Sequence, residues 1–278
     1  MVSATFSPAG RITHAFRHLG PGMALPAAAF FSFLPMLSPS AATTGHMDVD
    51  AAIVFAVDIS SSIDPRNADL QRQGHAEALR STEVAAAIAG GTTGCIAITY
   101  VEWSAPGWLR TVLPWTRICG DSDRNDAAAA ILARGYTGIE KRGRGSTAIS
   151  YALEASGILL DRLPGRAARN IIDISANGTN NDGPAVAGAR ERVVAKGYVI
   201  NAIVLDQIEP GVSDDLPGYF RQKVIGGAGA FVVVPESPAD YAPALRRKLV
   251  LEISATDPAA AIQVACARGP EVLFVNER

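Results

Sequence analysis

The chain has 278 residues, of which 48% are hydrophobic and 19% are charged, and its formal net charge at pH 7 is -2. A chain of this length and composition can bury a sizeable core, which argues against a disordered or fibrous protein. The slight acidity and the lack of Lys/Arg clusters interleaved with aromatic residues argue against a protein that binds nucleic acid.

The beginning of the chain has the pattern of an export signal. Arg11 and Arg17 occur without any acidic residue, and an apolar stretch at residues 23–37 is followed by small residues. A membrane anchor is the alternative, but two prolines interrupt this stretch, and it is shorter than the roughly 20 residues that a spanning helix needs. We expect residues 1–42 to be a cleaved signal peptide and residues 43–48 a linker, so that the mature protein is periplasmic or secreted.

Regular alternation of apolar runs and helical patterns follows the linker. Such alternation predicts an α/β fold with a mostly parallel central sheet and helices on both of its faces. One edge strand is expected to be antiparallel, because a turn near Pro106 and Gly107 joins two strands into a hairpin. Strands are expected at residues 51–57, 95–103, 109–115, 170–175, 198–205 and 230–234, and helices at residues 65–80, 83–89, 121–134, 147–161, 184–196 and 238–253.

A single domain is expected to cover residues 49–255. Asp64 and Pro65 suit the start of its first helix, since aspartate is a favourable N-cap and proline fits the first helical position. Residues 256–278 form a C-terminal extension, in which a helix at 258–267 and a short strand at 271–275 lack clear end signals.

The three cysteines, Cys95, Cys119 and Cys266, are too few for a disulfide scaffold and lack the C-x-x-C spacing of a metal site. If the predicted hairpin forms, Cys95 lies within reach of Cys119 after a small adjustment of the loop. An oxidising compartment would permit the bond. Two unlinked thiols, with Cys95 packed in a strand, are the alternative, and both remain open.

Oxygen-bearing side chains follow several predicted strands. Asp58, Ser60 and Ser62 come directly after the first strand, Thr147 stands at the start of a helix, and Asn177 precedes a glycine after a later strand. In an open α/β sheet, ligands collect outside the carboxyl ends of the strands. Mg²⁺ prefers octahedral oxygen ligands and often keeps water, which leaves a coordination position for a carboxylate from a partner.

These loops resemble the von Willebrand factor type A domain and its metal-ion-dependent adhesion site, with the pattern D-x-S-x-S, a later Thr and a D-G turn. The runs AVDIS, TYVEW and RRKLVLE look like an uncharacterised group of exported bacterial von Willebrand A-like proteins. The resemblance covers residues 48–254 and implies a three-layer sandwich. It also implies that Ser60, Ser62 and Thr147 contact Mg²⁺ or Mn²⁺, whereas Asp58 and the residue at position 177 often act through water.

One position departs from this pattern. Asn177 stands where the family has an aspartate, and its amide brings no negative charge. Metal affinity should therefore fall, while a bound cation becomes more attractive to a partner's carboxylate. Asp173 and Asp182 are the candidates for compensating the lost charge, and the sequence alone does not place either of them.

Each of these residues also has a plain structural interpretation. Ser60 and Ser62 are common in turns and caps, Thr147 is a plausible N-cap, and Asn177 before glycine is a frequent turn. Arg142 and Arg144 either attract an acidic partner or are simply solvated, and Glu102 is either a buried polar contact or a residue that supports the site. Three tryptophans, Trp103, Trp108 and Trp115, are expected to pack the hairpin rather than to bind a ligand.

Enzymatic interpretations are less favoured. A serine hydrolase needs a base such as histidine beside its nucleophile, but of four histidines only His75 lies in the expected domain, and no G-x-S-x-G motif occurs. A phosphoryl-transfer hydrolase of the haloacid dehalogenase type needs a second acid where Ser60 stands, and nucleotide-binding glycine motifs are absent.

The favoured hypothesis is therefore non-catalytic, divalent-cation-dependent binding of a protein or peptide ligand that offers an acidic side chain. The alternatives are a metal-free structural scaffold and, less favoured, the phosphoryl-transfer hydrolase. Neither nucleic acid nor, after signal cleavage, a membrane span is expected.

Overall fold

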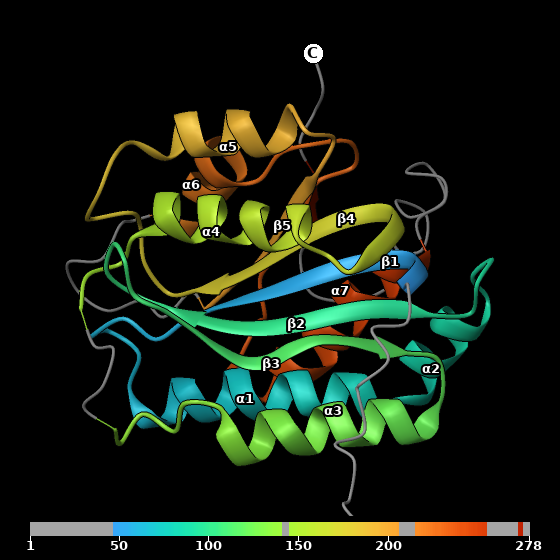
Figure 1. Cartoon of the computed structure of the whole chain (residues 1–278). Coiled ribbons are helices and arrows are strands. Elements are labelled where there is room, and N and C mark those ends of the chain that lie inside the picture. The colour runs from blue at the N-terminus through green and yellow to red at the C-terminus, as the bar shows by residue number, and fades with distance from the viewer. Residues whose placement is uncertain (1–46, 141–144, 206–214, 255–271, 275–278) are drawn as a thin grey trace, which may run out of the picture. The chain divides into compact units, whose positions relative to one another are not determined.

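The computed structural model describes residues 47–140, 145–205, 215–254 and 272–274. The expected signal peptide, the two loop arginines and the expected helix at 258–267 lie outside these ranges. The described strands form one sheet in the order β3-β2-β1-β4-β5-β6-β7 (Figure 1). They are β1 (Met47–Asp58), β2 (Ile96–Trp103), β3 (Leu109–Ile118), β4 (Gly165–Ala176), β5 (Val199–Val204), β6 (Phe231–Val233) and β7 (Val272–Phe274).

The sheet is parallel in its centre and antiparallel at both edges. Strand β1 pairs in parallel with β2 and β4, and β3 runs antiparallel to β2, which confirms the expected mostly parallel sheet with an antiparallel edge strand. At the other edge β7 pairs antiparallel with β6. The sheet thus receives a further edge strand from the stretch that was expected to be an extension.

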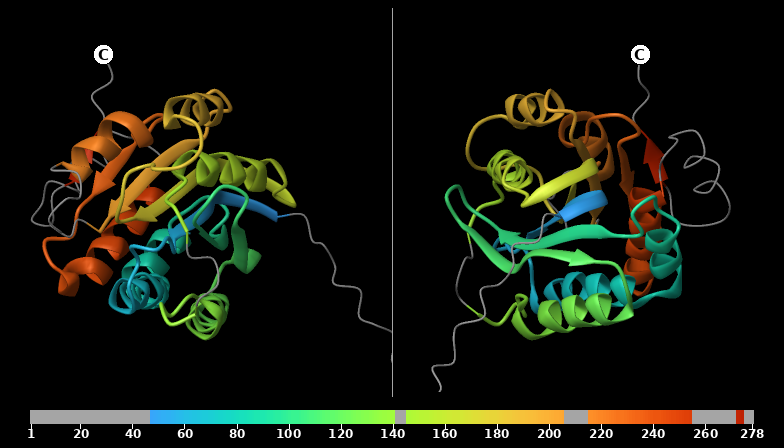
Figure 2. Two further views of the ribbon diagram at one scale, coloured as in Figure 1. Left: turned by 90° about the vertical axis from the view of Figure 1, so that its left-hand side faces the viewer. Right: turned by 45° about the vertical axis from the view of Figure 1, so that its right-hand side comes forward.

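Helices cover both faces, as expected for a three-layer sandwich (Figures 1 and 2). One face carries α1 (Pro65–Arg80), α2 (Thr82–Ala89), α3 (Asp121–Arg134) and α7 (Tyr241–Ser254), the last preceded by the short η2 (Pro238–Asp240). The other face carries α4 (Ile149–Asp161), α5 (Val186–Val194), α6 (Leu216–Tyr219) and the single turn η1 (Phe220–Val224). Within the described ranges, no helix has both the length and the apolar character needed to span a membrane.

Strand β1 lies inside the sheet, between β2 and β4, and is buried on both faces. Ile53 and Phe55 belong to the core beneath α1 and α7, whereas Val54 and Ala56 belong to the core beneath α4 and α5. A strand covered on both sides reads as a continuous apolar run. This run ends at Asp58, which places the following loop at the carboxyl edge of the sheet, beside the loop that follows the parallel neighbour β4.

Local signals explain how α1 begins and how it packs. The Asp64 carboxylate accepts the N–H of Asn67 at 2.7 Å, so that Asp64 is the N-cap, as expected. Further along, Gly74 lies against the ring of Tyr241 in α7, and a Cβ at position 74 would stand only 2.7 Å from that ring. The small residue therefore permits the close approach of the two helices.

Several boundaries differ from those expected. Strand β1 begins at Met47 instead of residue 51, so the last residues of the expected linker pair with the early part of β4, which itself starts before residue 170. These added segments lack a continuous apolar run, and they are strands because they pair with each other. The sequence pattern therefore did not predict them. Helices α6 and η1 were not predicted, since elements this short carry little periodicity.

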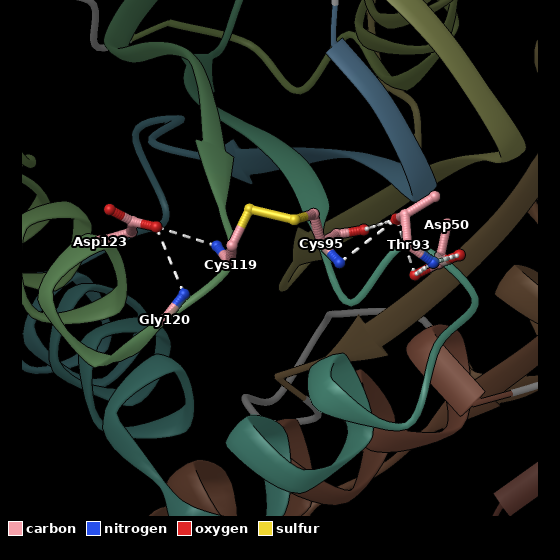
Figure 3. Close-up of a disulfide and its surroundings, with 6 residues drawn as sticks. All are labelled: Asp50, Thr93, Cys95, Cys119, Gly120 and Asp123. Atoms are coloured by element: carbon pink, nitrogen blue, oxygen red, sulfur yellow. Dashed lines mark hydrogen bonds between the residues drawn. A yellow bond between two sulfur atoms is a disulfide. The ribbon is translucent and has the colours of Figure 1, made fainter.

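A disulfide joins Cys95 and Cys119 at the open end of the β2–β3 hairpin (Figure 3). The register brings them together, because Ile96 pairs with Ile118 next to them. The carboxylate of Asp123 accepts the N–H of Cys119 at 2.9 Å. Of the two alternatives left open by the sequence, the structure therefore contains the bonded one, while Cys266 lies outside the described residues.

Candidate functional site

Asp58, the last residue of β1, is fully buried at the carboxyl edge of the sheet. Its Oδ1 accepts the N–H of Ser60 at 2.7 Å, whereas Oδ2 has no hydrogen-bond partner among the described residues. Burial raises the pKa of this carboxyl to about 7, even though the main-chain and hydroxyl groups of Ser60 and the main-chain N–H of Asn177 oppose the shift. A buried carboxylate with an unsatisfied oxygen is costly unless a proton or a cation neutralises it.

The hydroxyls that follow Asp58 reach the loop after β4. Ser60 Oγ lies 3.1 Å from Ser62 Oγ, which in turn donates to Asn177 Oδ1 at 2.8 Å. The amide of Asn177 returns a hydrogen bond to the main-chain oxygen of Ser62 at 3.1 Å. Oxygen atoms from two separate loops therefore form one continuous cluster beside Asp58.

The loop before α4 joins the same cluster. The N–H of Ser61 donates to the main-chain oxygen of Gly145 at 2.9 Å, and a Cβ placed on Gly178 would lie 3.7 Å from Thr147 Oγ1. Thr147 is buried, and the N-cap of α4 is Ala148, so Thr147 does not act as the helix cap. The structure thus brings together the loops that hold all five residues expected to form the site.

Two asparagines that sequence reasoning missed connect these loops. Asn181 Oδ1 accepts the N–H of Thr147 at 2.7 Å, and Asn180 Oδ1 accepts the N–H of Ser150 at 3.0 Å. The loop after β4 thereby satisfies main-chain donors at the start of α4, which has no side-chain cap of its own. The run T-N-N-D-G was the available signal, since Asn and Asp favour such caps.

The two acids considered as replacements for the missing aspartate lie in different places in the structure. Asp173 is fully buried in β4 and pairs with Lys248 Nζ at 2.6 Å, which commits it to the layer between the sheet and α7. Asp182 is exposed, and it accepts the hydroxyl of Ser146 at 2.5 Å, next to Thr147. Only Asp182 therefore lies near the rim of the candidate site.

This set of donors has one buried carboxylate and otherwise neutral oxygens. In the part of the chain that the structure describes, no three side chains of His, Cys, Asp or Glu gather where they could hold a metal ion. A cation here would depend on Asp58 and on hydroxyl and amide oxygens, which suit hard ions such as Mg²⁺ or Mn²⁺. The unsatisfied Asp58 Oδ2 fits such an ion, and the small negative charge limits how tightly it is held.

Glu102 is a buried polar contact outside this cluster. Its carboxylate accepts hydrogen bonds from Arg110 Nε at 3.0 Å and from the N–H of Tyr136 at 2.5 Å. The hairpin tryptophans belong to the packing as well: Trp103 is fully buried, and Trp115 Nε1 donates to the main-chain oxygen of Leu159. None of these side-chain contacts involves a residue of the oxygen cluster.

His75 is a core residue. Its ring meets those of Phe55 and Tyr100 edge to face, with centroids 4.9 and 5.1 Å away, and its Nδ1 lies 2.7 Å from the main-chain oxygen of Gln71. Burial lowers the pKa of this imidazole. Enclosed in this way, His75 has no contact with Ser60 or Ser62 that would let it act as their base.

Comparisons with known proteins agree with this architecture. A family model described as "Protein of unknown function (DUF1194)" matches residues 48–257. No curated protein matches the chain.

Among solved structures with similar folds is proximal thread matrix protein 1 from the mussel byssus, determined with zinc in its metal-ion-dependent adhesion site (MIDAS) motif. It has 19% identity and a TM-score of 0.56, and the match covers 75% of this chain and 49% of that one. A von Willebrand factor type A protein from Catenulispora acidiphila has 16% identity and a TM-score of 0.51 over 74% and 43%. The pilus adhesin SpaC from Lactobacillus rhamnosus GG has 13% identity and a TM-score of 0.53 over 74% and 31%. The match spans less than half of each of these proteins, and at such identities the likeness shows the fold alone, which is that of a von Willebrand factor type A domain.

Proposed function

Because the chain belongs to the DUF1194 family and has a von Willebrand A-like fold, we propose that it binds a protein or peptide partner through a divalent cation at the carboxyl-edge loops. The observation that carries this proposal is the buried Asp58 Oδ2, which lacks a hydrogen-bond partner among the described residues. Asp58 supplies the negative charge, the hydroxyls of Ser60, Ser62 and Thr147 hold the ion, and Asn177 orients a water. When bound, the cation offers a coordination position to an acidic side chain of the partner.

The protonation of Asp58 supports this role. With a pKa raised to about 7 by burial, the carboxyl is partly protonated near neutral pH when nothing neutralises its charge. Metal ligands of this kind must be deprotonated, so that ion binding releases a proton and is favoured by higher pH. The costly buried charge thus becomes an anchor once a cation is present.

Asn177 sets the strength of the site. A neutral amide in place of an aspartate leaves Asp58 as the one charged residue among the five, so the ion keeps more of its positive charge for the partner. A zinc-occupied MIDAS motif in a byssus protein and a comparable fold in a pilus adhesin support cation-dependent protein binding. The oxygen donors favour Mg²⁺ or Mn²⁺ here, and the setting we propose is outside the cytoplasm, without catalysis.

Isothermal titration calorimetry with Mg²⁺ and Mn²⁺ tests the proposal. The exported protein should release or absorb heat on binding either ion, and Asp58→Asn should abolish the signal while preserving the fold by circular dichroism. Asp123→Asn is the matched control, because it removes a carboxylate that accepts main-chain N–H groups before α3, away from the site. That variant should bind the ion like the unmodified protein.

Other outcomes would favour the alternatives. A protein that gives no heat with either ion would be a metal-free scaffold. Mg²⁺-dependent hydrolysis of para-nitrophenyl phosphate that disappears in Asp58→Asn would instead indicate a phosphoryl-transfer hydrolase.

A further inference from the structure

Gln71 of α1 is a buried amide that uses both of its ends beneath the candidate site. Its Nε2 donates to the main-chain oxygen of Asp58 at 2.9 Å, and its Oε1 accepts the hydroxyl of Ser175 at 2.6 Å. Ser175 stands opposite Val57 in the parallel pairing of β4 with β1. A single side chain therefore connects the ends of the two strands that carry the loops of the site.

The direction of these hydrogen bonds is fixed by chemistry. The oxygen of Asp58 can only accept, so Nε2 of Gln71 must face it and Oε1 must face Ser175. The hydroxyl of Ser175 then donates to Gln71 and is left to accept from Tyr241 Oη, 3.0 Å away at the start of α7. Tyr241, Ser175, Gln71 and Asp58 thus form a one-way relay of buried hydrogen bonds, in which each member orients the next.

The relay ends on the peptide unit that follows Asp58. The C=O of this unit accepts from Gln71, and its N–H, which belongs to Ile59, donates to the main-chain oxygen of Trp103 at 2.9 Å. Both polar groups of the unit are therefore held, and the plane cannot rotate without breaking one of the two bonds. The next N–H along the chain, that of Ser60, points back to the Asp58 carboxylate at 2.7 Å.

We propose that Gln71 is a positioning residue of the cation site, oriented by Ser175 and Tyr241. This inference rests on the proposed function and extends it. Gln71 is not a ligand of the ion, but it fixes the main-chain conformation that orients the Asp58 carboxylate and the Ser60 hydroxyl. Side chains that orient metal ligands in this way commonly change metal affinity by about 10- to 100-fold when they are replaced.

Calorimetric titration with Mn²⁺ tests the role of Gln71. Gln71→Met keeps the length and apolar stem of the side chain but removes both hydrogen bonds, so the affinity should fall about tenfold. Thr99→Val is the matched control, because Thr99 is a buried hydroxyl of β2 that donates to the main-chain oxygen of Leu113 at 2.8 Å. It should lose stability in denaturant while its Mn²⁺ affinity stays unchanged.

A double-mutant cycle separates positioning from a general loss of stability. Ser175→Ala should weaken Mn²⁺ binding by itself, yet should add nothing to Gln71→Met, because Ser175 acts only through Gln71. Should Gln71→Met fail to fold, Ser175→Ala and Tyr241→Phe test the same relay with smaller changes. If these variants bind Mn²⁺ as tightly as the unmodified protein, the role of Gln71 is overturned but the proposed function stands. If the unmodified protein binds no Mn²⁺, the proposed function itself is overturned.

Discussion

Lys248 Nζ lies 2.6 Å from Asp173 Oδ1, and neither side chain is exposed to solvent. Glu252, one turn further along α7, brings a second carboxylate to 2.5 Å from the same ammonium. Asn201 of β5 donates to Glu252 at 2.8 Å, and the ring of Phe231 lies 5.8 Å from Lys248 Nζ. Two acids therefore share one base inside the core, and full ionisation would leave one buried negative charge uncompensated.

The first prediction concerns the pH dependence of stability. Burial, followed by the charge of Asp173, raises the pKa of Glu252 to about 8, above the 4.5 expected of an unfolded chain. The unfolded chain therefore gives up this proton first, so the stabilising contribution is complete below pH 4.5 and is lost as the pH rises through about 8. Between pH 4.5 and 8, the free energy of unfolding measured in urea should fall less steeply with pH in Glu252→Gln than in the unmodified protein. The two slopes should differ by at most about 1.4 kcal/mol per pH unit.

Equal slopes in the two proteins would mean that Glu252 is already ionised in the folded state. Other buried groups also contribute to the slope in this pH range, among them His75, whose pKa is lowered by burial, and Asp58, whose pKa burial raises to about 7. Comparing two proteins that differ only at position 252 keeps these contributions common to both.

The second prediction concerns the base itself. Lys248→Met fills a similar volume but leaves Asp173 and Glu252 buried without a cation, and breaking a buried pair in this way costs about 3 to 5 kcal/mol of the free energy of unfolding. Lys196→Met is the matched control. Lys196 pairs with Asp161 at 2.6 Å, but both side chains are about two-fifths exposed, so its loss should cost less than about 1 kcal/mol. Denaturant midpoints that shift equally for the two variants would contradict this.

The third prediction concerns the hairpin disulfide. Cys95 and Cys119 are 24 residues apart in sequence, and closing a loop of this length stabilises a protein by about 3 kcal/mol in the chain-entropy description. The double variant Cys95→Ala/Cys119→Ala should unfold at correspondingly lower urea concentration under non-reducing conditions. In a reducing buffer the unmodified protein should fall to the level of the variant. A difference that persists there would place the stabilisation in packing rather than in the cross-link.

The elements that carry the site could be predicted because each has a local signal. The buried run of β1 ends at Asp58, and the Asp64 cap with the following proline marks the start of α1. The loops after β1 and β4 also follow from the parallel order of the strands, since strands that run together end at the same edge. The loop that holds Thr147 lies between α3 and α4, so strand order does not place it. Residues that are close in sequence therefore determined most of the architecture.

What could not be predicted depends on contacts between distant segments. Arg246, Arg247 and Lys248 form one basic run, yet Arg246 reaches Glu83 at the surface while Lys248 is fully buried. Nor does local sequence reveal that Asn181 caps Thr147, because the two are 34 positions apart. Which face of β4 carries Asp173 became clear only once the strand was seen between its neighbours.

The last prediction introduces an aspartate at position 177, where the metal-ion-dependent adhesion pattern that the sequence resembles has one. Asn177→Asp adds a second carboxylate beside Asp58, and since the number of charged ligands sets the affinity of oxygen sites, Mn²⁺ should bind about tenfold more tightly by calorimetry. Without the ion, the two carboxylates repel each other, so the variant should melt lower than the unmodified protein and gain more from added Mn²⁺. Thr179→Asp, two positions along the same loop, introduces the same charge as a control and should raise the affinity much less. Equal gains in both variants would show that the ion responds to the general field of the loop and that position 177 has no specific role in the site.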